Sequence, residues 1–288
     1  MKNINTLVLH SGIMHMDDLL CAAMVKYYYP AVKVVRTNRV PETLEPGTIV
    51  CDVGGVYDPE RNMFDHHNEC PAFEDGTKHA AIGLFLMNYP DIHIPGALMS
   101  DIVTAERIDN GDLSKIEGYH PLNIARVSNP NWDSDKSSDD CFFEALEILL
   151  ENYVKPMMKG SDPNHEVLKA YYDEKESESE RSFKAAEEVV MAAYNKSADK
   201  RIVELPVFAP WQQYLVNTEA VFVIYPSLRG GANLQCVPAE AGSFKSKKLL
   251  PNWRETSAPE GMTFCHPACF LASFETVDQA IRAAKEVM

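Results

Sequence analysis

Short apolar runs and one amphipathic stretch alternate through the first 51 residues. Residues 6–9 form an apolar run of strand length, and from Asp17 to Tyr27 apolar residues recur at helical spacing. Two further runs with β-branched residues follow at positions 32–35 and 49–51. This order predicts a β-α-β unit with a third strand, which is typical of a parallel sheet with helices on both faces.

The middle of the chain is predicted to be helical and is strongly acidic. Apolar residues are spaced as on amphipathic helices over residues 142–153 and again over residues 183–193. Residues 133–180 hold 14 acidic against 5 basic side chains, with the most charged stretch at residues 173–180. We interpret this stretch as a solvated helix face or a mobile connection between two domains.

Strand patterns return near the C-terminus. The apolar runs at residues 220–225, 234–237 and 263–264 predict three strands. The sequence Thr276-x-x-Gln279 is a capping box, and it predicts the start of a final helix.

The chain of 288 residues is long enough for two domains. The pattern predicts an α/β fold, in which a Rossmann-like parallel-sheet domain precedes a smaller α+β domain. The expected regions are residues 1–130 for the first domain, 131–200 for a helical acidic connection and 201–288 for the C-terminal domain.

Composition narrows the possible functions. The chain carries 27 Lys and Arg against 42 Asp and Glu, a formal net charge of −15. This balance argues against a protein that coats duplex nucleic acid, because phosphate neutralisation needs clustered cations. A phosphate substrate would have to be held locally, for instance through metal ions. Residues 201–254 are locally basic, with six bases against three acids.

Seven cysteines, an odd number, lie mostly inside apolar segments. We therefore expect reduced thiols and a cytoplasmic protein rather than a disulfide framework. Cys265-His266-x-x-Cys269 has the spacing of half a zinc site, but no second ligand pair is evident nearby, so buried thiols are the preferred interpretation. No apolar run approaches roughly 18 residues, so no membrane span is expected. The sequence does not predict an oligomeric state.

Four polar clusters contain residue types that bind metal ions. They are His10-Ser-Gly-Ile-Met-His15-Met-Asp17-Asp18, Asp52 before Gly54-Gly55, Asp65-His66-His67, and Asp109 before Asn110-Gly111. Singly, such an aspartate caps a helix or turn, and paired histidines are ordinary surface residues. Together the clusters place several carboxylates and imidazoles at expected strand ends, where unpaired buried charge is costly. A divalent cation is the simplest neutraliser, and a mixed Asp and His set favours Mn²⁺, Fe²⁺ or Zn²⁺ over Ca²⁺.

These clusters resemble the DHH phosphoesterase superfamily, because Asp65-His66-His67 is accompanied by an upstream His-x-x-x-x-His-x-Asp and a lone strand-end aspartate. Within that superfamily the chain resembles the melanocyte-proliferating-gene family, formerly described as metal-dependent protein hydrolases and later associated with RNA exonuclease activity. The similar segments span nearly the whole chain in order, and besides the four clusters they include residues 129–132, 235–238, 243–253 and 264–266.

The resemblance implies that residues 1–130 form a DHH-type catalytic domain with two metal sites. One ion would be bound by His10, His15 and Asp52, and the other by Asp17, Asp52, His66 and Asp109. His67 would then face the phosphate as a catalytic residue, and Asp65 would orient the histidine pair. We expect two Mn²⁺ ions, with Mg²⁺, Fe²⁺ or Zn²⁺ as alternatives.

The resemblance also implies that the C-terminal domain binds substrate. Its candidate contacts are Arg229, Gly230, Gly231 and His266, whereas Lys247 and Lys248 are either phosphate contacts or solvated surface lysines. Residues 270–274 lack the glycines that family members usually carry at this point.

We therefore expect a metal-dependent phosphoesterase that acts as an exonuclease on RNA or short oligonucleotides, using water activated by two metal ions. One alternative is a phosphohydrolase of a small phosphorylated metabolite or cyclic dinucleotide, and another is a non-catalytic metal-dependent binding module. A protein hydrolase is less favoured, because the chain contains no His-Glu-x-x-His helix motif.

Overall fold

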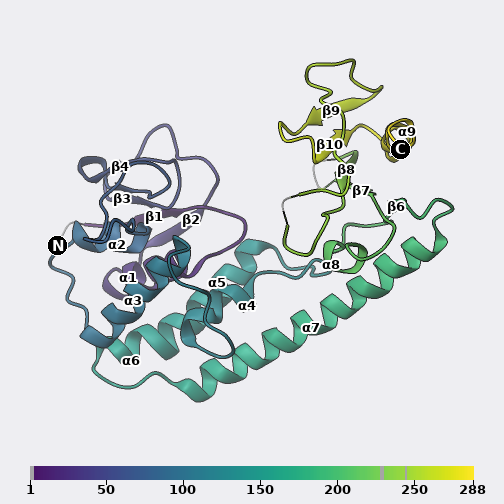
Figure 1. Cartoon of the computed structure of the whole chain (residues 1–288). Helices are drawn as coiled ribbons and strands as arrows, with labels where there is room; N and C mark the ends of the chain where they lie inside the picture. Colours follow the sequence, from purple (N-terminus) through teal and green to yellow (C-terminus); the bar gives the residue numbers. More distant parts are fainter. Residues whose placement is uncertain (1–2, 228–229, 244) are drawn as a thin grey trace. The chain divides into compact units, whose positions relative to one another are not determined.

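A computed structural model of the chain describes residues 3–227, 230–243 and 245–288. The chain forms two compact units, Met1–Glu178 (unit 1) and Ser179–Met288 (unit 2), and Figure 1 labels most of their helices and strands. The boundary falls inside helix α7 (His165–Lys196), so the acidic stretch at residues 173–180 is helical rather than a mobile connection. Residues 131–178 of the expected acidic connection belong to unit 1.

Unit 1 contains a five-stranded sheet with the strand order β2-β1-β3-β5-β4. The strands are β1 (Thr6–Leu9), β2 (Lys33–Arg36), β3 (Thr48–Cys51), β4 (Tyr57–Asp58) and β5 (Met63–Phe64). β1 pairs in parallel with β2 and β3, and β3 pairs in parallel with β5, whereas β4 runs antiparallel to β5. The predicted parallel α/β arrangement is confirmed, and the carboxyl ends of the parallel strands meet at one edge.

Helices make up most of the rest of unit 1. They are α1 (Met16–Tyr28), α2 (Ala81–Met87), α3 (Gly96–Asp109), α4 (Ile124–Ser128), α5 (Ser138–Leu149), α6 (Lys155–Met158) and the first part of α7. Short 3-10 helices lie at Pro59–Arg61 (η1) and Pro121–Asn123 (η2), and a π-helical turn at Leu150–Val154 (η3) continues α5. The amphipathic pattern of residues 142–153 therefore corresponds to α5 and η3.

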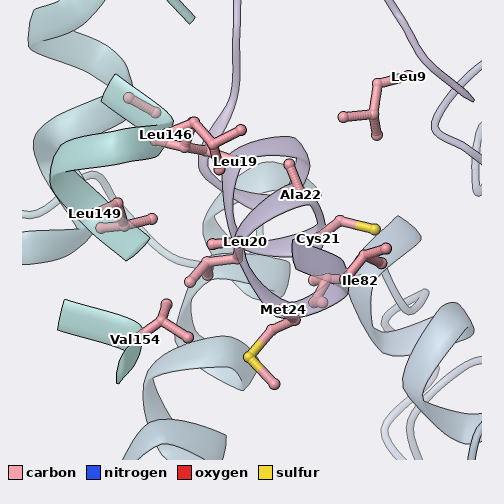
Figure 2. Close-up of a cluster of buried hydrophobic side chains, with 14 of the residues drawn as sticks. Leu9, Leu19, Leu20, Cys21, Ala22, Met24, Ile82, Leu146, Leu149 and Val154 are labelled. Carbon is pink, nitrogen blue, oxygen red and sulfur yellow. The ribbon is translucent and has the colours of Figure 1, made fainter. Parts of the chain in front are cut away.

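Helix α1 is the centre of the apolar core of unit 1. Residues 17–25 of this helix are all buried, because its sequence is apolar or small on every side after the first turn. Figure 2 shows Leu20 and Met24 of α1 facing Val154 and Leu149, while Cys21 faces Ile82 of α2. The first turn of α1 is therefore held rigidly at the end of β1.

The opposite face of the sheet is covered differently from the prediction. Val8, Val50 and Met63 on this face pack against Val40 and Leu44. These two side chains come from the connection between β2 and β3, where two prolines oppose helix formation. Among the described residues the helical layer of this core lies on one face, which corrects the expected helices on both faces.

Unit 2 combines the end of α7 with a second five-stranded sheet, of order β6-β7-β8-β10-β9. Its elements are β6 (Ile202–Glu204), α8 (Gln212–Leu215), β7 (Phe222–Pro226), β8 (Ala232–Cys236), β9 (Met262–Cys265), β10 (Leu271–Phe274) and α9 (Val277–Glu286). β7, β8 and β9 correspond to the three predicted strands. The Thr276 hydroxyl accepts a hydrogen bond from the Gln279 N–H (3.3 Å), as the capping box predicts.

Two further observations concern the cysteines and the helices of the described residues. All seven cysteines are free thiols, as expected. No helix in the described ranges is both long and apolar enough to cross a membrane.

The central position of α1 makes one substitution diagnostic. Leu20→Ala, at a fully buried position, should lower the free energy of unfolding of unit 1 by about 2–5 kcal/mol, because it leaves a cavity. Leu113→Ala, at a position 44% exposed in the same unit, should change it by less than about 0.5 kcal/mol. Urea unfolding followed by hydrogen exchange of unit 1 amides measures both, and equal losses would contradict the central role of α1.

Candidate metal centre

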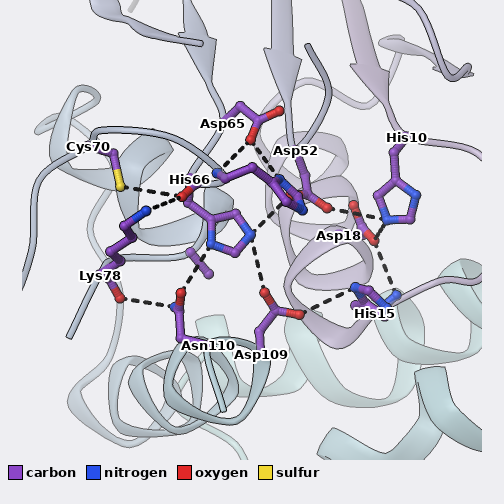
Figure 3. Close-up of polar contacts among 12 residues, drawn as sticks. His10, His15, Asp18, Asp52, Asp65, His66, Cys70, Lys78, Asp109 and Asn110 are labelled. Atoms are coloured by element: carbon purple, nitrogen blue, oxygen red, sulfur yellow. Dashed lines mark hydrogen bonds and ion pairs between the residues drawn. The ribbon is translucent and has the colours of Figure 1, made fainter. Parts of the chain in front are cut away.

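The four polar clusters converge at the carboxyl ends of the parallel strands in unit 1. His10 follows β1, Asp52 follows β3, and Asp65 to His67 follow β5. His15 and Asp17 stand at the start of α1, and Asp109 ends α3. Figure 3 shows His10, His15, Asp52, His66 and Asp109 pointing toward one another, as expected where parallel strands end at one edge.

Asp52 is held in an uncommon backbone conformation. Its φ of +55° lies in the left-handed region, which costs a non-glycine residue energy and is typical of functional sites. Gly54 and Gly55 follow with φ of +100° and +68°. A Cβ on Gly54 would lie 2.5 Å from a methyl of Val40, so this turn requires glycine.

The loop that carries His10 and His15 is fixed by two distant side chains. Asn129 accepts from the Met14 N–H (2.8 Å) and donates to the Met14 carbonyl (3.0 Å). Arg36, whose side chain is fully buried, donates to the Gly12 carbonyl (3.0 Å) and to Asp139 (2.7 Å). Both imidazoles are therefore positioned before any ligand binds.

Glu106 fixes the other side of the cluster. Its buried carboxylate accepts from the Ala80 N–H (3.1 Å) at the start of α2 and contacts His79 Nδ1 (3.0 Å). A Cβ on Gly83 would lie 1.8 Å from this carboxylate, so α2 and α3 approach closely there. This anchor sets the position of Asp109, three residues further along α3.

Three groups of candidate ligand atoms result, and within each group the atoms lie within 4.8 Å of one another. The groups are His10, His15, Asp18 and Asp52; Asp52, His66 and His67; and His15, Asp17 and Asp109. Asp52 belongs to the first two groups: one oxygen lies 3.3 Å from His10 Nε2 and the other 3.2 Å from His66 Nε2. One carboxylate therefore joins two neighbouring groups.

Unpartnered polar atoms test whether the cluster fits a metal ion. Both oxygens of Asp17, one of Asp18 and one of Asp52 are buried without a hydrogen-bond partner among the described residues. His10 Nε2 lies 2.5 Å from Asp18 without a directed hydrogen bond. Buried carboxylate oxygens of this kind are costly unless a cation binds them. The donor set is suitable for divalent ions that accept both imidazole and carboxylate ligands.

The pKa values express the same excess of negative charge. Burial, reinforced by the charges of Asp18 and Asp52, raises the pKa of Asp17 well above its usual range. Burial likewise raises the pKa of Asp18 to about 6 and raises that of Asp109. Burial lowers the pKa of His10, but Asp18 and Asp52 outweigh it and raise this pKa to about 9. Without a cation, the cluster therefore retains protons.

Asn110 determines which nitrogen of His66 can bind a metal. Its amide nitrogen donates to the carbonyls of Lys78 (3.0 Å) and Glu106 (2.9 Å), so its oxygen faces His66 Nδ1 (3.2 Å). Nδ1 must then carry a proton, which leaves Nε2 as the ligand atom. His66 Nε2 lies 3.2 Å from both Asp52 and Asp109. A cation bound by these three side chains, which face one another in Figure 3, would satisfy all of them.

Asp65 and His67 form a separate arrangement at the rim. Asp65 accepts from the N–H groups of Gly55 (2.7 Å) and His67 (2.9 Å) and contacts His67 Nδ1 (2.8 Å). Burial opposes ionisation of Asp65, but these hydrogen bonds prevail and lower its pKa. The His67 side chain is 64% exposed, so Asp65 holds an imidazole whose Nε2 is available to a ligand.

The structure places the predicted site residues in two sets. It brings together His10, His15, Asp17, Asp52, Asp65, His66, His67 and Asp109 in unit 1. Gly230, Gly231 and His266 belong to unit 2, and Arg229 lies outside the described residues.

The unit 2 residues have clear structural roles. A Cβ on Gly231 would lie 2.1 Å from the Phe274 carbonyl oxygen, so close packing of β8 and β10 requires this glycine. His266 Nδ1 accepts from the Ala268 N–H (3.1 Å) within its turn. Lys247 donates to the carbonyls of Leu215, Thr218 and Ala220 at 3.3, 2.7 and 3.0 Å, so it holds a turn rather than extending into solvent.

Two site residues, Asp18 and Asn110, stood within or beside the polar clusters but were given no role from the sequence. Asp18 contacts His10 and also accepts from the His15 N–H (3.1 Å), so its sequence position looked like that of an ordinary capping acid. Asn110 follows Asp109 directly, and this adjacency is the one signal that could have identified it.

The fold and the site together define an α/β protein in which one carboxylate, that of Asp52, belongs to two groups of candidate metal ligands. A family model described as Uncharacterised protein family (UPF0160) matches residues 6–113 and 122–288, and the chain belongs to this family, the MYG1 family. No solved structure matches the chain significantly.

Named relatives match between half and nearly all of the chain. It is 27% identical to the MYG1 exonuclease of Rattus norvegicus over 97% of this chain and 83% of the relative. Identity to the MYG1 exonuclease of Homo sapiens is also 27%, over 97% of this chain and 84% of that protein. The MYG1 protein of Chlamydia pneumoniae is 29% identical over 49% of this chain and 50% of its own length.

The role of Asn110 in orienting His66 can be separated from its role in ending α3. Asn110→Ala should weaken Mn²⁺ binding by about 10- to 100-fold, because His66 loses the partner that fixes its tautomer. Asn88→Ala is the matched control, since Asn88 similarly ends α2 and donates to the Leu84 carbonyl. Titration calorimetry gives the affinities, and ¹⁵N NMR of the imidazoles reports the His66 tautomer. Unchanged tautomer and affinity in Asn110→Ala would refute this assignment.

Metal binding should depend on pH with a definite sign. The raised pKa values of Asp17 and His10 mean that the metal-free cluster holds protons, which stabilise it at low pH and leave as pH rises. Mn²⁺ must displace these protons. The increase in Tm caused by Mn²⁺ should therefore be larger at pH 8 than at pH 6, reaching about 5–10 °C near 100 times Kd.

Asp17→Asn should reduce that Mn²⁺ effect and raise the Tm of the metal-free protein at pH 8, because it removes a buried charge. Asp75→Asn, at an exposed site paired with Arg107, is the control and should leave the Mn²⁺ effect intact. A Mn²⁺ effect that shrinks as pH rises would contradict the proton competition.

Proposed function

We propose that the protein is a metal-dependent phosphoesterase of the DHH type that acts as an exonuclease on RNA or short oligonucleotides. The observation that carries the proposal is Asp52, whose two oxygens face two separate imidazole groups while neighbouring buried carboxylate oxygens lack partners. The exonuclease names of the rat and human relatives support the reaction class.

Two divalent ions, which we propose to be Mn²⁺, would supply Lewis acidity and an activated water when bound. His10, His15, Asp18 and Asp52 are suited to hold one of them. Asp52, His66 and Asp109 are suited to hold the other, with Asn110 fixing the His66 ring. Asp17, whose carboxylate is grouped with that of Asp109, is proposed as a further ligand of this ion. The carboxylates of Asp17, Asp18 and Asp52 are buried, and low-dielectric surroundings strengthen their electrostatic interactions.

His67 is proposed to contact the phosphate directly. Asp65 holds its Nδ1, so a protonated ring can donate from Nε2 to a non-bridging phosphate oxygen as negative charge develops there. Asp65 itself is buried and fully used by Gly55 and His67, which suits a residue that orients and does not bind metal.

A second candidate function is hydrolysis of a small phosphorylated metabolite or cyclic dinucleotide. A cavity of about 230 Å³ in unit 1 is lined by His15, Asp109, Lys115 and Arg126, among others. It combines two cations with two candidate metal ligands, and its small volume suits a single phosphorylated group.

Two substitutions test the proposed chemistry. Asp52→Asn should lower bound metal and abolish hydrolysis, because a neutral amide is a poor shared ligand. His67→Ala should retain metal but lower kcat about 10²- to 10³-fold, because it removes transition-state stabilisation. Metal analysis and Mn²⁺-dependent hydrolysis of labelled RNA, DNA and bis-nitrophenyl phosphate measure both effects.

The substrates in that assay separate the two candidates. Rapid hydrolysis of oligonucleotides from one end supports the exonuclease, whereas turnover confined to small esters and cyclic dinucleotides supports the metabolite phosphohydrolase. Full activity in Asp52→Asn would refute both.

A further inference from the structure

Unit 2 contains a cavity that the metal chemistry does not use. Its volume is about 730 Å³, within the range of small-molecule sites. It lies against the sheet where Tyr225 of β7 and Gln235 of β8 project, and it is bounded by Phe208, Trp211 and the segment 241–243. Phe222, Leu234 and Phe274 pack with α9 instead, so the cavity is on the sheet face away from that helix.

Aromatic rings form one wall of the cavity. Phe208 is 38% exposed, and it meets Tyr225 edge to face at 5.3 Å between centroids. Trp211 is almost completely buried beside them. An exposed ring held by a buried tyrosine is a preformed stacking surface, because little conformational freedom is lost on binding.

Amide groups supply the polar contacts. The Tyr225 hydroxyl donates to Gln235 Oε1 (2.6 Å), so the nitrogen end of the Gln235 amide is the end that can donate to a ligand. Gln212 and Gln213 line the cavity and are exposed. None of the described residues lining the cavity is charged.

This chemistry selects the ligand. The described lining offers no counter-charge for a phosphate or carboxylate, so its chemistry does not favour an anionic group. Aromatic stacking combined with donor and acceptor amides matches a planar heterocycle that carries donors and acceptors on its edge. We propose that this cavity binds an unpaired nucleobase, either within a single strand or in a free nucleotide; the choice of ligand rests on the proposed nuclease function.

The proposal excludes paired substrates. A base must leave its partner before both its ring face and its edge can enter a cavity of this kind. Binding in this cavity would therefore make unit 2 select single strands. Such selection does not need a dense positive surface, which is not expected for a chain of net charge −15.

Binding without hydrolysis tests the proposal directly. The full chain is kept in EDTA, and fluorescence anisotropy measures its Kd for a fluorescein-labelled single-stranded octaribonucleotide and for the same strand made wholly abasic. Phe208→Ala should weaken binding of the intact strand about tenfold, the usual loss for one stacked base. The abasic strand should bind wild type about tenfold more weakly, and Phe208→Ala should weaken it no further.

Two further variants sharpen the result. Phe183→Ala removes a ring of similar exposure (45%) in the same unit but outside the cavity, and it should change neither Kd. Gln235→Leu removes the amide donor and should weaken the intact strand selectively. Adenosine monophosphate is also tested as a competitor. If Phe208→Ala abolishes this competition but leaves the Kd for the strand unchanged, the cavity binds the base of a free nucleotide.

Two other sets of results would contradict the proposal. The proposal would be overturned if wild type and Phe208→Ala had equal Kd values for both the strand and the nucleotide. It would also be overturned if Phe208→Ala weakened binding of the intact and the abasic strands equally. Mn²⁺-dependent hydrolysis is measured separately, so base-dependent binding without hydrolysis would refute the nuclease and keep the cavity. Hydrolysis without base dependence would do the reverse.

Discussion

Mutual repulsion among buried carboxylates is the constraint on which the structure of unit 1 depends. Asp17, Asp18, Asp52 and Asp109 converge at one sheet edge, and burial raises the pKa of three of them. The N-terminus of α1 offsets part of this charge, since a helix begins with the positive end of its dipole. A dipole equivalent to about half a charge does not balance four carboxylates, and without a cation the raised pKa values of Asp17 and His10 leave protons on the cluster. The arrangement is therefore suited to divalent cations, which would replace those protons.

The fold supports this unfavourable cluster through ordinary packing. Helix α1 is buried nearly all round and carries Asp17 and Asp18 in its first turn, so its apolar core holds the acids in place. Asn129 and Arg36 fix the loop before α1, and Glu106 fixes the turn of α3. Stability generated in the core is thus used to maintain a strained and charged site, as is common in enzymes.

The sequence predicted the location of the site better than its detailed contacts. Strand-end placement was enough to group His10, Asp52 and Asp65, because parallel strands end at one edge whatever their exact register. It could not distinguish Asp18 from a capping acid, since both roles use the same first-turn position. It also could not show the role of Asn110, which depends on carbonyls of Lys78 and Glu106 that only the tertiary structure brings together.

Part of the fold was also beyond the sequence pattern. β10 is Leu-Ala-Ser-Phe, a segment too short and too weakly β-forming to be recognised before its neighbours are known. Val8 and Val50 are covered by two side chains of the β2–β3 connection, Val40 and Leu44. The sequence pattern does not predict the packing of two single side chains. By contrast, α1 and α9 were predictable because apolar content and a capping box act locally.

The central claim is that Asp52 is shared by two metal ions. Anomalous diffraction at the manganese edge, from crystals grown with Mn²⁺, tests it most directly. The account predicts two anomalous peaks, one on the His10 side of the Asp52 carboxylate and one on the His66 side. A single peak, or peaks that do not contact Asp52, would contradict it.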